Sequence, residues 1–344
     1  MSSNPLVKHP PWRQLLIVSL VVPVVVTLAV MAFTWPAART VPRDLPVGVV
    51  GDSDLGLGRS RPGAFDLHLY ADDAAARRAI DDRDVYGAFE AAPGRVTVLT
   101  ATAASPAVAQ LLTTVVQQAA GPSVRVATVD VVPASRSDSR ASVFGSMMSP
   151  LVLGAEILAV VVAVLIGFRP ALRQLLALAV VSAVTAGGVY LLVQGYLGAL
   201  PGDRLGDWGA LALTLFALSA TTAGLASLIG PGGVAVGAAL MVFVGNPFAA
   251  ITSAPELLPK AVARLGQLLP PGAGSNLLRS TAYFGGHGAA IHVVVLAAWS
   301  VFGILAIVEG HRRAALRHAA RHRVELIESP LRDALIRDSH LLES

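Results

Sequence analysis

Residues 15–33 read LLIVSLVVPVVVTLAVMAF, and no charged residue occurs anywhere from residue 14 to residue 38. A helix needs about 20 apolar residues to cross a hydrocarbon core of about 30 Å. A secretory signal peptide is the alternative, but its apolar core is only about 7–15 residues long and ends at a cleavage site of small residues. We therefore interpret this stretch as a retained membrane-spanning helix, bent at Pro23.

The composition of the whole chain agrees with this interpretation. Of its 344 residues, 54% are hydrophobic and 14% charged, and the mean hydropathy is +0.65. A soluble domain carries roughly 25% charged residues. The lack of cysteine excludes disulfides, thiolate metal sites and cysteine nucleophiles. Alanine, valine, glycine and arginine are abundant and lysine is rare, as in high-GC bacterial genomes, so we predict a bacterial cytoplasmic membrane protein.

Further apolar stretches lie at residues 148–168, 174–197 and 289–308. Residues 208–255 are also uncharged but too long for one helix, and the GPGG at residues 230–233 divides them into two spans. The sequence thus predicts six membrane helices, arranged as one followed by five. We expect Gly224 and Gly237 to bring the two helices of the hairpin together.

Lysine and arginine in the flanking loops set the orientation. Lys8 and Arg13 precede the first span, Arg169 and Arg173 separate the second from the third, and five arginines follow the last. We therefore expect residues 1–38 to form a cytoplasmic N-terminus and first span, residues 143–309 a five-helix domain, and residues 310–344 a basic cytoplasmic tail.

Residues 39–142 differ in composition and are predicted to form an extracytoplasmic α/β domain. Alternating or buried apolar runs predict strands in DLPVGVVGD, FDLHLYAD, VYGAFEA, GRVTVLTAT and SVRVATVDVVP. Helices are predicted after the aspartates at residues 72–73 and after Ser105-Pro106. The expected order is β-β-α-β-β-α-β.

Motifs for chemistry are missing. No lysine follows a glycine in a phosphate loop, and the sequence contains neither His-Glu-x-x-His nor Gly-x-Ser-x-Gly. His318 and His322 share a helix face but stand among arginines, which disfavour a metal ion. We predict that the chain is not an enzyme and has no cofactor, no metal and no nucleic-acid partner.

Glu156 is the one carboxylate within an otherwise apolar span, and such residues are functional candidates. It has three possible roles: carrying a proton or cation, pairing with an arginine such as Arg279, or accepting a helix–helix hydrogen bond. In the tail, Arg313, Arg317 and Arg321 form a stripe at helical spacing. This stripe suits an acidic partner or anionic head groups, or simply stops the last span.

The region before the last span contains a series of short motifs in a fixed order. These are Asn246-Pro247, Leu258-Pro259, Pro271-Gly272, Leu277-Leu278-Arg279 and Tyr283-Phe284. In this order, and with a domain after the first span, the chain resembles the membrane subunit of type-2 ABC exporters, in particular the YhgE/Pip-like branch of actinobacteria.

The resemblance implies an export permease that moves an amphipathic or lipid-like substrate, works as a homodimer and has its ATPase on a separate chain. It also implies that a broken, re-entrant segment at about residues 252–288 closes the outer end of the path, with prolines that stop a helix and glycines that permit the turn back. Candidate transport and gating residues are Glu156, Asn246, Pro247, Pro271, Gly272 and Arg279. Arg279 would meet lipid head groups or the outer domain.

One feature departs from the resemblance. The predicted cytoplasmic loops are short, since the one at residues 169–173 has about five residues, and they give an ATPase little surface for docking. The alternative function is therefore a non-transporting scaffold whose outer domain binds an envelope protein or assists another transporter.

Overall fold

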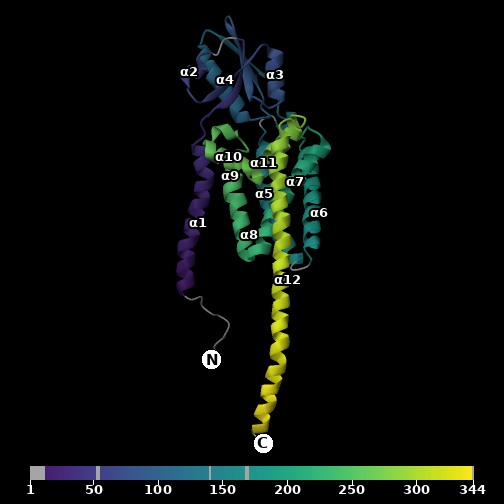
Figure 1. Ribbon diagram of the computed structural model, residues 1–344. Helices are drawn as coiled ribbons and strands as arrows, with labels where there is room; N and C mark the ends of the chain where they lie inside the picture. Colours follow the sequence, from purple (N-terminus) through teal and green to yellow (C-terminus); the bar gives the residue numbers. More distant parts are fainter. Residues whose placement is uncertain (1–11, 52–54, 139–140, 167–169, 343–344) are drawn as a thin grey trace, which may run out of the picture.

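The computed structural model describes residues 12–51, 55–138, 141–166 and 170–342, apart from the side chains of Gln14, Ile166 and residues 321–342. The predictions on residues 1–11, on Arg169 and on the side chain of Arg321 thus lie outside the described part. Within that part, six helical segments are long and apolar enough to cross a membrane. Figure 1 shows a sheet-containing domain at one end of the molecule and long helices beneath it.

We call the end with the sheet the domain side and the opposite end the far side. The first spanning segment is α1 (Trp12–Ala38), and the others form a bundle of α5 (Ser142–Ile166), α6 (Ala171–Tyr190), α7 (Arg204–Ile229), α8 (Pro231–Ala238) and α12 (Ala289–Leu342). Short π-helical stretches, Leu191–Tyr196 and Ala239–Gly245, extend α6 and α8, and the second leads into α9 (Asn246–Phe248).

α7 lies at the centre of the bundle, and 56% of its apolar window is buried, whereas none of the window of α1 is. In Figure 1, α1 stands beside the other helices on the edge of the molecule. A helix that is apolar all round and unburied by protein is stable only when lipid or another protein covers it. The apolar face of α1 is therefore available to the membrane.

The helical hairpin confirms the predicted break but not the predicted contact of Gly224. Gly230 has φ of 72° and ends α7, and Pro231 opens α8. A Cβ on Gly224 would lie 2.8 Å from the carbonyl oxygen of Gly303 in α12, so this glycine allows α7 to approach α12, not α8. Gly237 does face α7, with Thr222 in contact.

The sheet domain (residues 39–138) contains the predicted elements in the predicted order. Its strands are β1 (Leu45–Val50), β2 (Phe65–Tyr70), β3 (Gly87–Ala92), β4 (Arg95–Thr100) and β5 (Arg125–Asp130), and its helices are α2 (Leu57–Ser60), α3 (Asp73–Asp81) and α4 (Pro106–Ala120). The strand order is β2-β1-β3-β4-β5, with only the β3–β4 pair antiparallel.

Side chains alternate between the two faces of this sheet, as the pleat requires. Val47 and Phe89 belong to a cluster with α4, and Val50 and Ala88 belong to another with α3. Asp72 caps α3 by accepting from the Ala75 amide at 2.7 Å, and Ser105 caps α4. The sheet is therefore covered on both faces and has a core of its own.

Asp138 caps the second span. This span, α5, begins at Ser142, six residues before the apolar stretch that starts at residue 148. The Asp138 carboxylate accepts from the amides of Ser142 and Val143, both at 2.8 Å, and is itself buried. These are amides at a helix start that have no partner within the helix. The cap fixes the direction in which the chain enters the bundle from the sheet domain.

Candidate functional site

The broken segment (residues 252–288) lies on the domain side, between the sheet domain and the bundle. It contains a short 3-10 turn, Pro255–Leu257, and two helices, α10 (Lys260–Leu268) and α11 (Pro270–Tyr283). All but two residues of α11 are buried. Ala273, Leu277 and Leu278 belong to the main core of the bundle together with residues of α5 and α7. α11 is thus a packed part of the bundle, whereas α10 lies on the surface, with only Gly266 among its residues buried.

Its prolines stop a helix as predicted, but Gly272 acts differently from the prediction. α10 ends at Leu268, before the extended Leu269, and Pro270 and Pro271 then also open α11. Gly272 is within α11 and makes no turn. A Cβ there would lie 2.1 Å from the carbonyl oxygen of Gly266, and Pro271 packs on Gly245. These residues permit close packing of α10, α11 and the end of α8.

The sheet domain packs on both ends of the broken segment. Leu257 is part of the α4-side core of the domain, and Phe284 is part of the α3-side core. The amides of Val41 and Arg43 donate to the carbonyls of Leu257 and Glu256 at 3.0 Å. The domain and the segment therefore share hydrophobic cores, so a displacement of one would displace the other.

Arg83 carries the main side-chain contact between them. It follows α3 with φ of 66°, a left-handed conformation that glycine or asparagine usually supplies at a helix end. Its guanidinium donates to the side-chain oxygen of Asn276 at 3.0 Å, to the backbone carbonyl of Asn276 at 3.2 Å and to the Ser280 hydroxyl. It also lies over the ring of Phe284. A strained residue that makes such contacts is a candidate functional residue.

Arg279 is buried beside this contact, with only 4% of its surface exposed. It donates to Asn276 Oδ1 at 3.2 Å and to the carbonyl of Ile251 at 2.8 Å, and lies 4.8 Å from the centre of the Phe144 ring. Its burial contradicts the predicted contact with lipid head groups. Arg279 reaches the sheet domain only through Asn276, which both arginines share.

Asn276 is the centre of this network. Its amide nitrogen donates to Gln267 Oε1 at 2.6 Å, and Gln267 in turn donates to the carbonyl of Ala249. Within the described residues, neither Arg83 nor Arg279 forms an ion pair with a carboxylate. Burial lowers the pKa of Arg279 to about 10, and the charge of Arg83 adds to this effect. Both guanidiniums remain cations at neutral pH.

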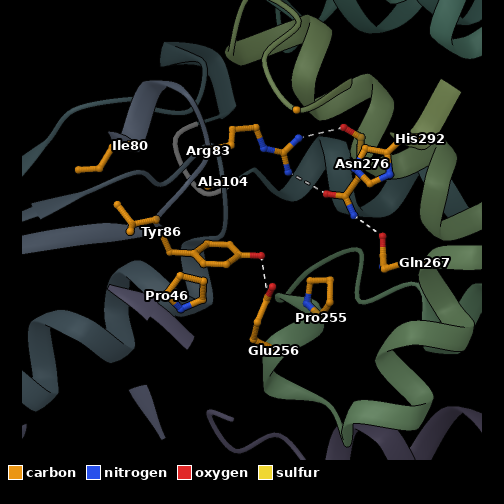
Figure 2. A pocket seen from close by; sticks show the side chains of 12 residues that line it. Pro46, Ile80, Arg83, Tyr86, Ala104, Pro255, Glu256, Gln267, Asn276 and His292 are labelled. Atoms are coloured by element: carbon orange, nitrogen blue, oxygen red, sulfur yellow. Dashed lines mark hydrogen bonds between the residues drawn. The ribbon is translucent and has the colours of Figure 1, made fainter. Parts of the chain in front are cut away.

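A cavity of about 260 Å³ opens between the domain and the segment. Figure 2 shows Arg83 and Tyr86 entering it from the sheet domain, with Glu256, Asn276 and His292 on the side of the helices. The Tyr86 hydroxyl donates to Glu256 Oε2 at 2.8 Å. Burial and the adjacent Glu256 raise the pKa of Tyr86, so the phenol keeps its proton and remains a donor.

Asn246 and Pro247 line a second cavity of about 320 Å³, which reaches the domain-side end of α1 at Pro36. The Asn246 amide donates to the Ser149 hydroxyl at 3.0 Å, which links the end of the hairpin to α5. The predicted site residues Asn246, Pro247, Pro271, Gly272 and Arg279 thus all lie on the domain side, although they contact different neighbours.

Glu156 is separate from that group. The prediction that it pairs with Arg279 is wrong, because Arg279 has other partners. Only 6% of Glu156 is exposed. Among the described residues neither carboxylate oxygen forms a hydrogen bond of regular geometry, and the polar group beside it is the Thr222 hydroxyl of α7. A carboxylate removed from water without a partner is costly. Such a residue within an apolar helix is a functional candidate.

The far side holds more polar atoms without partners. A cavity of about 470 Å³ there is lined by Val160, one turn from Glu156 on α5, and by Gln174 and His311. Gln174 Oε1 and His311 Nε2 are buried without hydrogen-bond partners. Beyond them, Arg313 and Arg317 are exposed on α12, and Arg313 pairs with Glu309 at 2.7 Å. The tail is thus a helical continuation of the last span.

Sequence reasoning missed Arg83, Asn276, Gln267, Tyr86 and Glu256. Two signals were available: a charged residue directly after a helix, in DDRDVYG, and a polar residue three positions before Arg279. It also missed Asp207, whose buried carboxylate lies beside the Thr281 side chain and in the first turn of α7, where a negative charge is favourable.

The comparisons with known proteins return no match to the chain, whether among family models, curated proteins or solved structures.

Proposed function

We propose that the chain is a membrane permease of the exporter type, moving an amphipathic or lipid-like molecule from the cytoplasm or inner leaflet to the outside. In this proposal the six candidate spans cross a bacterial cytoplasmic membrane, with both chain ends inside and the sheet domain outside. The resemblance to type-2 ABC exporter subunits supports it, as do the positions of the broken segment and of Glu156.

The observation that carries the proposal is the double packing of the broken segment. α11 is buried in the bundle core, while Leu257 and Phe284, on either side of α10 and α11, are buried in the cores of the sheet domain. Broken helices at membrane depth are tolerated only where protein buries them or where they line a cavity. Here the segment closes the bundle on the domain side, and movement of the domain opens it.

Glu156 is the group available to the substrate or to a proton along the path. It lies in α5 between the closed domain side and the far-side cavity at Val160. Its polar neighbour among the described residues is the uncharged Thr222 hydroxyl, so the charge of the carboxylate is not neutralised and is available to a cationic group or a proton. Energy for export comes from a separate ATPase subunit, because the chain has no phosphate loop of its own.

The alternative is a scaffold that assists another transporter, and one observation favours it. The entire apolar window of α1 is unburied, which would suit a partner protein in the membrane. A homodimer of the permease would use the same surface.

The two functions are separated by purifying the intact complex in mild detergent from its native membrane. A permease is expected to copurify with an ATP-hydrolysing subunit. In reconstituted vesicles the complex should then move fluorescent phosphatidylethanolamine or fluorescent phosphatidylglycerol between leaflets when ATP is added. A complex without ATPase activity and without lipid movement, but with a second transporter or an envelope protein, would replace the permease by the scaffold.

A further inference from the structure

The cavity between the sheet domain and the broken segment holds two opposite charges that are kept apart. Arg83 is bound by Asn276 and Ser280 on one wall, and Glu256 by Tyr86 on another. Figure 2 shows the two groups on different sides of the hollow. Both are described residues, yet no ion pair joins them. Each is fixed by neutral hydrogen-bonding partners, and the cavity lies between.

This arrangement is unusual for a purely structural contact. Hydrogen bonds between an arginine and a carboxylate are among the strongest that side chains form. Here the acceptors of Arg83 are instead an amide oxygen, a carbonyl and a hydroxyl, none of which neutralises its charge. Its backbone also adopts the left-handed conformation, which is unfavourable for a residue with a side chain.

Other groups complete the two ends of the cavity. His292 lines it beside Asn276, and within the described part of the chain its ring has no hydrogen-bond or ion-pair partner. Arg279 lies behind Asn276 and adds a second positive charge to that wall. Pro46, Ile80 and Val85 supply apolar surface from the domain. The cavity therefore has a cationic end, an anionic end and apolar walls.

We propose that this cavity binds a zwitterionic head group, with its phosphate at Arg83 and His292 and its ammonium at Glu256. Arginine binds phosphate through several parallel hydrogen bonds, and a carboxylate is the usual partner of an ammonium. The volume of about 260 Å³ accommodates a phosphoethanolamine group. The cavity lies where the domain meets the spans, which in the proposed topology is the level of the outer lipid head groups. The inference rests on the proposed function, since it names the substrate class of the same closure.

The test is a binding titration by calorimetry on the full-length protein in detergent, which needs no ATPase. Short-chain phosphatidylethanolamine is expected to bind at least roughly tenfold more tightly than short-chain phosphatidylglycerol, which lacks the ammonium. Free phosphoethanolamine is the second probe. If it binds as tightly as the lipid, the ligand is a soluble zwitterion. If the lipid binds more tightly, the ligand is a phospholipid.

Two substitutions test the two ends separately. Glu256→Gln should abolish the preference for the ethanolamine lipid while phosphatidylglycerol binds as before or better. Arg83→Gln should weaken both lipids by roughly tenfold, and Arg83→Lys should weaken them less. Glu90→Gln and Arg77→Gln are the matched controls, because both residues belong to the sheet domain outside this cavity and make the same change of charge.

Equal binding of the two lipids to the unsubstituted protein would overturn the inference, as would no binding of either. If Arg83→Gln fails to fold, the Glu256→Gln titration decides alone. The proposed function fails in a different way, through the absence of ATP-dependent lipid movement. A protein that moves both lipids but binds them equally would retain the function and lose this inference.

Discussion

Arg279 and Glu156 are both ionisable and both nearly inaccessible to solvent, but the molecule treats them in opposite ways. The guanidinium of Arg279 donates to an amide oxygen and a backbone carbonyl and lies over an aromatic ring. Among the described residues, Glu156 has only the Thr222 hydroxyl beside it and no hydrogen bond of regular geometry. On the domain side, polar groups connect α10, α11 and the sheet domain into one closed unit. Farther from the sheet domain, the bundle buries polar groups that form no hydrogen bond of regular geometry among the described residues.

In the proposed permease, this difference separates residues that stabilise the fold, such as Arg279, from residues that act in transport, such as Glu156. A buried charge whose partners are complete is costly to disturb, and it holds elements in one arrangement. A buried carboxylate whose charge is not compensated contributes little to that arrangement, and neutralising it should not weaken the fold. Substitutions on the domain side should therefore lower stability, whereas substitution of Glu156 should lower transport.

The largest loss of stability is expected at Gly266, where the backbone of α10 packs directly on the backbone of α9. In Gly266→Ala, the added Cβ would lie 1.8 Å from the carbonyl oxygen of Phe248, which cannot move without shifting α9. We expect a destabilisation of about 3 kcal/mol or more and the loss of monodisperse protein in size-exclusion chromatography. Gly154→Ala in α5 is the control, because no atom lies within 4 Å of the new methyl group. Equal behaviour of the two variants would contradict the packing described for α10.

The next effect is expected at Asn276, the acceptor that the two arginines share. Asn276→Ala leaves both guanidiniums short of a partner, and a hydrogen bond to a charged group is worth about 1.5–3 kcal/mol. We expect the thermal unfolding temperature to fall and proteolysis between the sheet domain and α5 to accelerate.

The control is Asn246→Ala, which removes an amide that bonds only the Ser149 hydroxyl within the described residues. A fall in unfolding temperature as large as that of Asn276→Ala would show that the two arginines add nothing special to the closure.

Glu156→Gln should give the reverse pattern. An uncharged amide costs less to bury than a carboxylate, so the unfolding temperature should stay the same or rise. Transport of fluorescent lipid in vesicles should fall by about tenfold, equivalent to about 1.4 kcal/mol. The matched control is Asp207→Asn, at a carboxylate that is also buried without a hydrogen bond of regular geometry among the described residues but lies at a helix start, and it should transport normally. A stable Glu156→Gln protein with full transport would remove Glu156 from the path.

The smallest effect is expected from Asp138→Ala, which removes the cap of α5. Loss of a cap costs about 1 kcal/mol, and the amides of Ser142 and Val143 lose their partner. Circular dichroism during heating should show a modest fall in unfolding temperature without loss of transport. Asp138→Asn should recover most of the stability, since asparagine is also a good cap. If Asp138→Ala lost as much stability as Asn276→Ala, Asp138 would belong to the closure itself.

The sequence was sufficient for most of the fold, because hydropathy and turn residues are local. The apolar stretches predicted six spans, and strand and helix patterns predicted the order of elements in the sheet domain. Several boundaries differed, since α7 begins at Arg204 and the fifth span ends at Phe248, and the short helix α2 in the sheet domain was not predicted. α5 begins early because Asp138 caps it, and α12 continues to Leu342 as a helix beyond the apolar stretch.

The candidate site was only partly predictable for a physical reason. Pro271, Gly272 and Arg279 were found because proline, glycine and charge are conspicuous in an apolar region. Arg83 and Asn276 are 193 positions apart, and nothing local indicates that they meet. One alternative paired Arg279 with Glu156 because their charges are opposite. In the structure, Arg279 donates to neutral acceptors instead, and Glu156 has no arginine beside it among the described residues.

The central claim is that the broken segment closes the path and must move during transport. Gly145 in α5 and Thr252 at the start of the segment are suited to test it, because a Cβ on Gly145 would lie 3.9 Å from that of Thr252. Disulfides join Cβ atoms about 3.5–4.5 Å apart, and the chain has no cysteine of its own.

The measurement is lipid transport by the G145C/T252C protein, before and after oxidation and again after reduction, with both single variants as controls. The account predicts that oxidation stops transport only in the double variant and that dithiothreitol restores it. Transport at an undiminished rate with the disulfide fully formed would contradict the account, because a segment tied to α5 would then have no need to move.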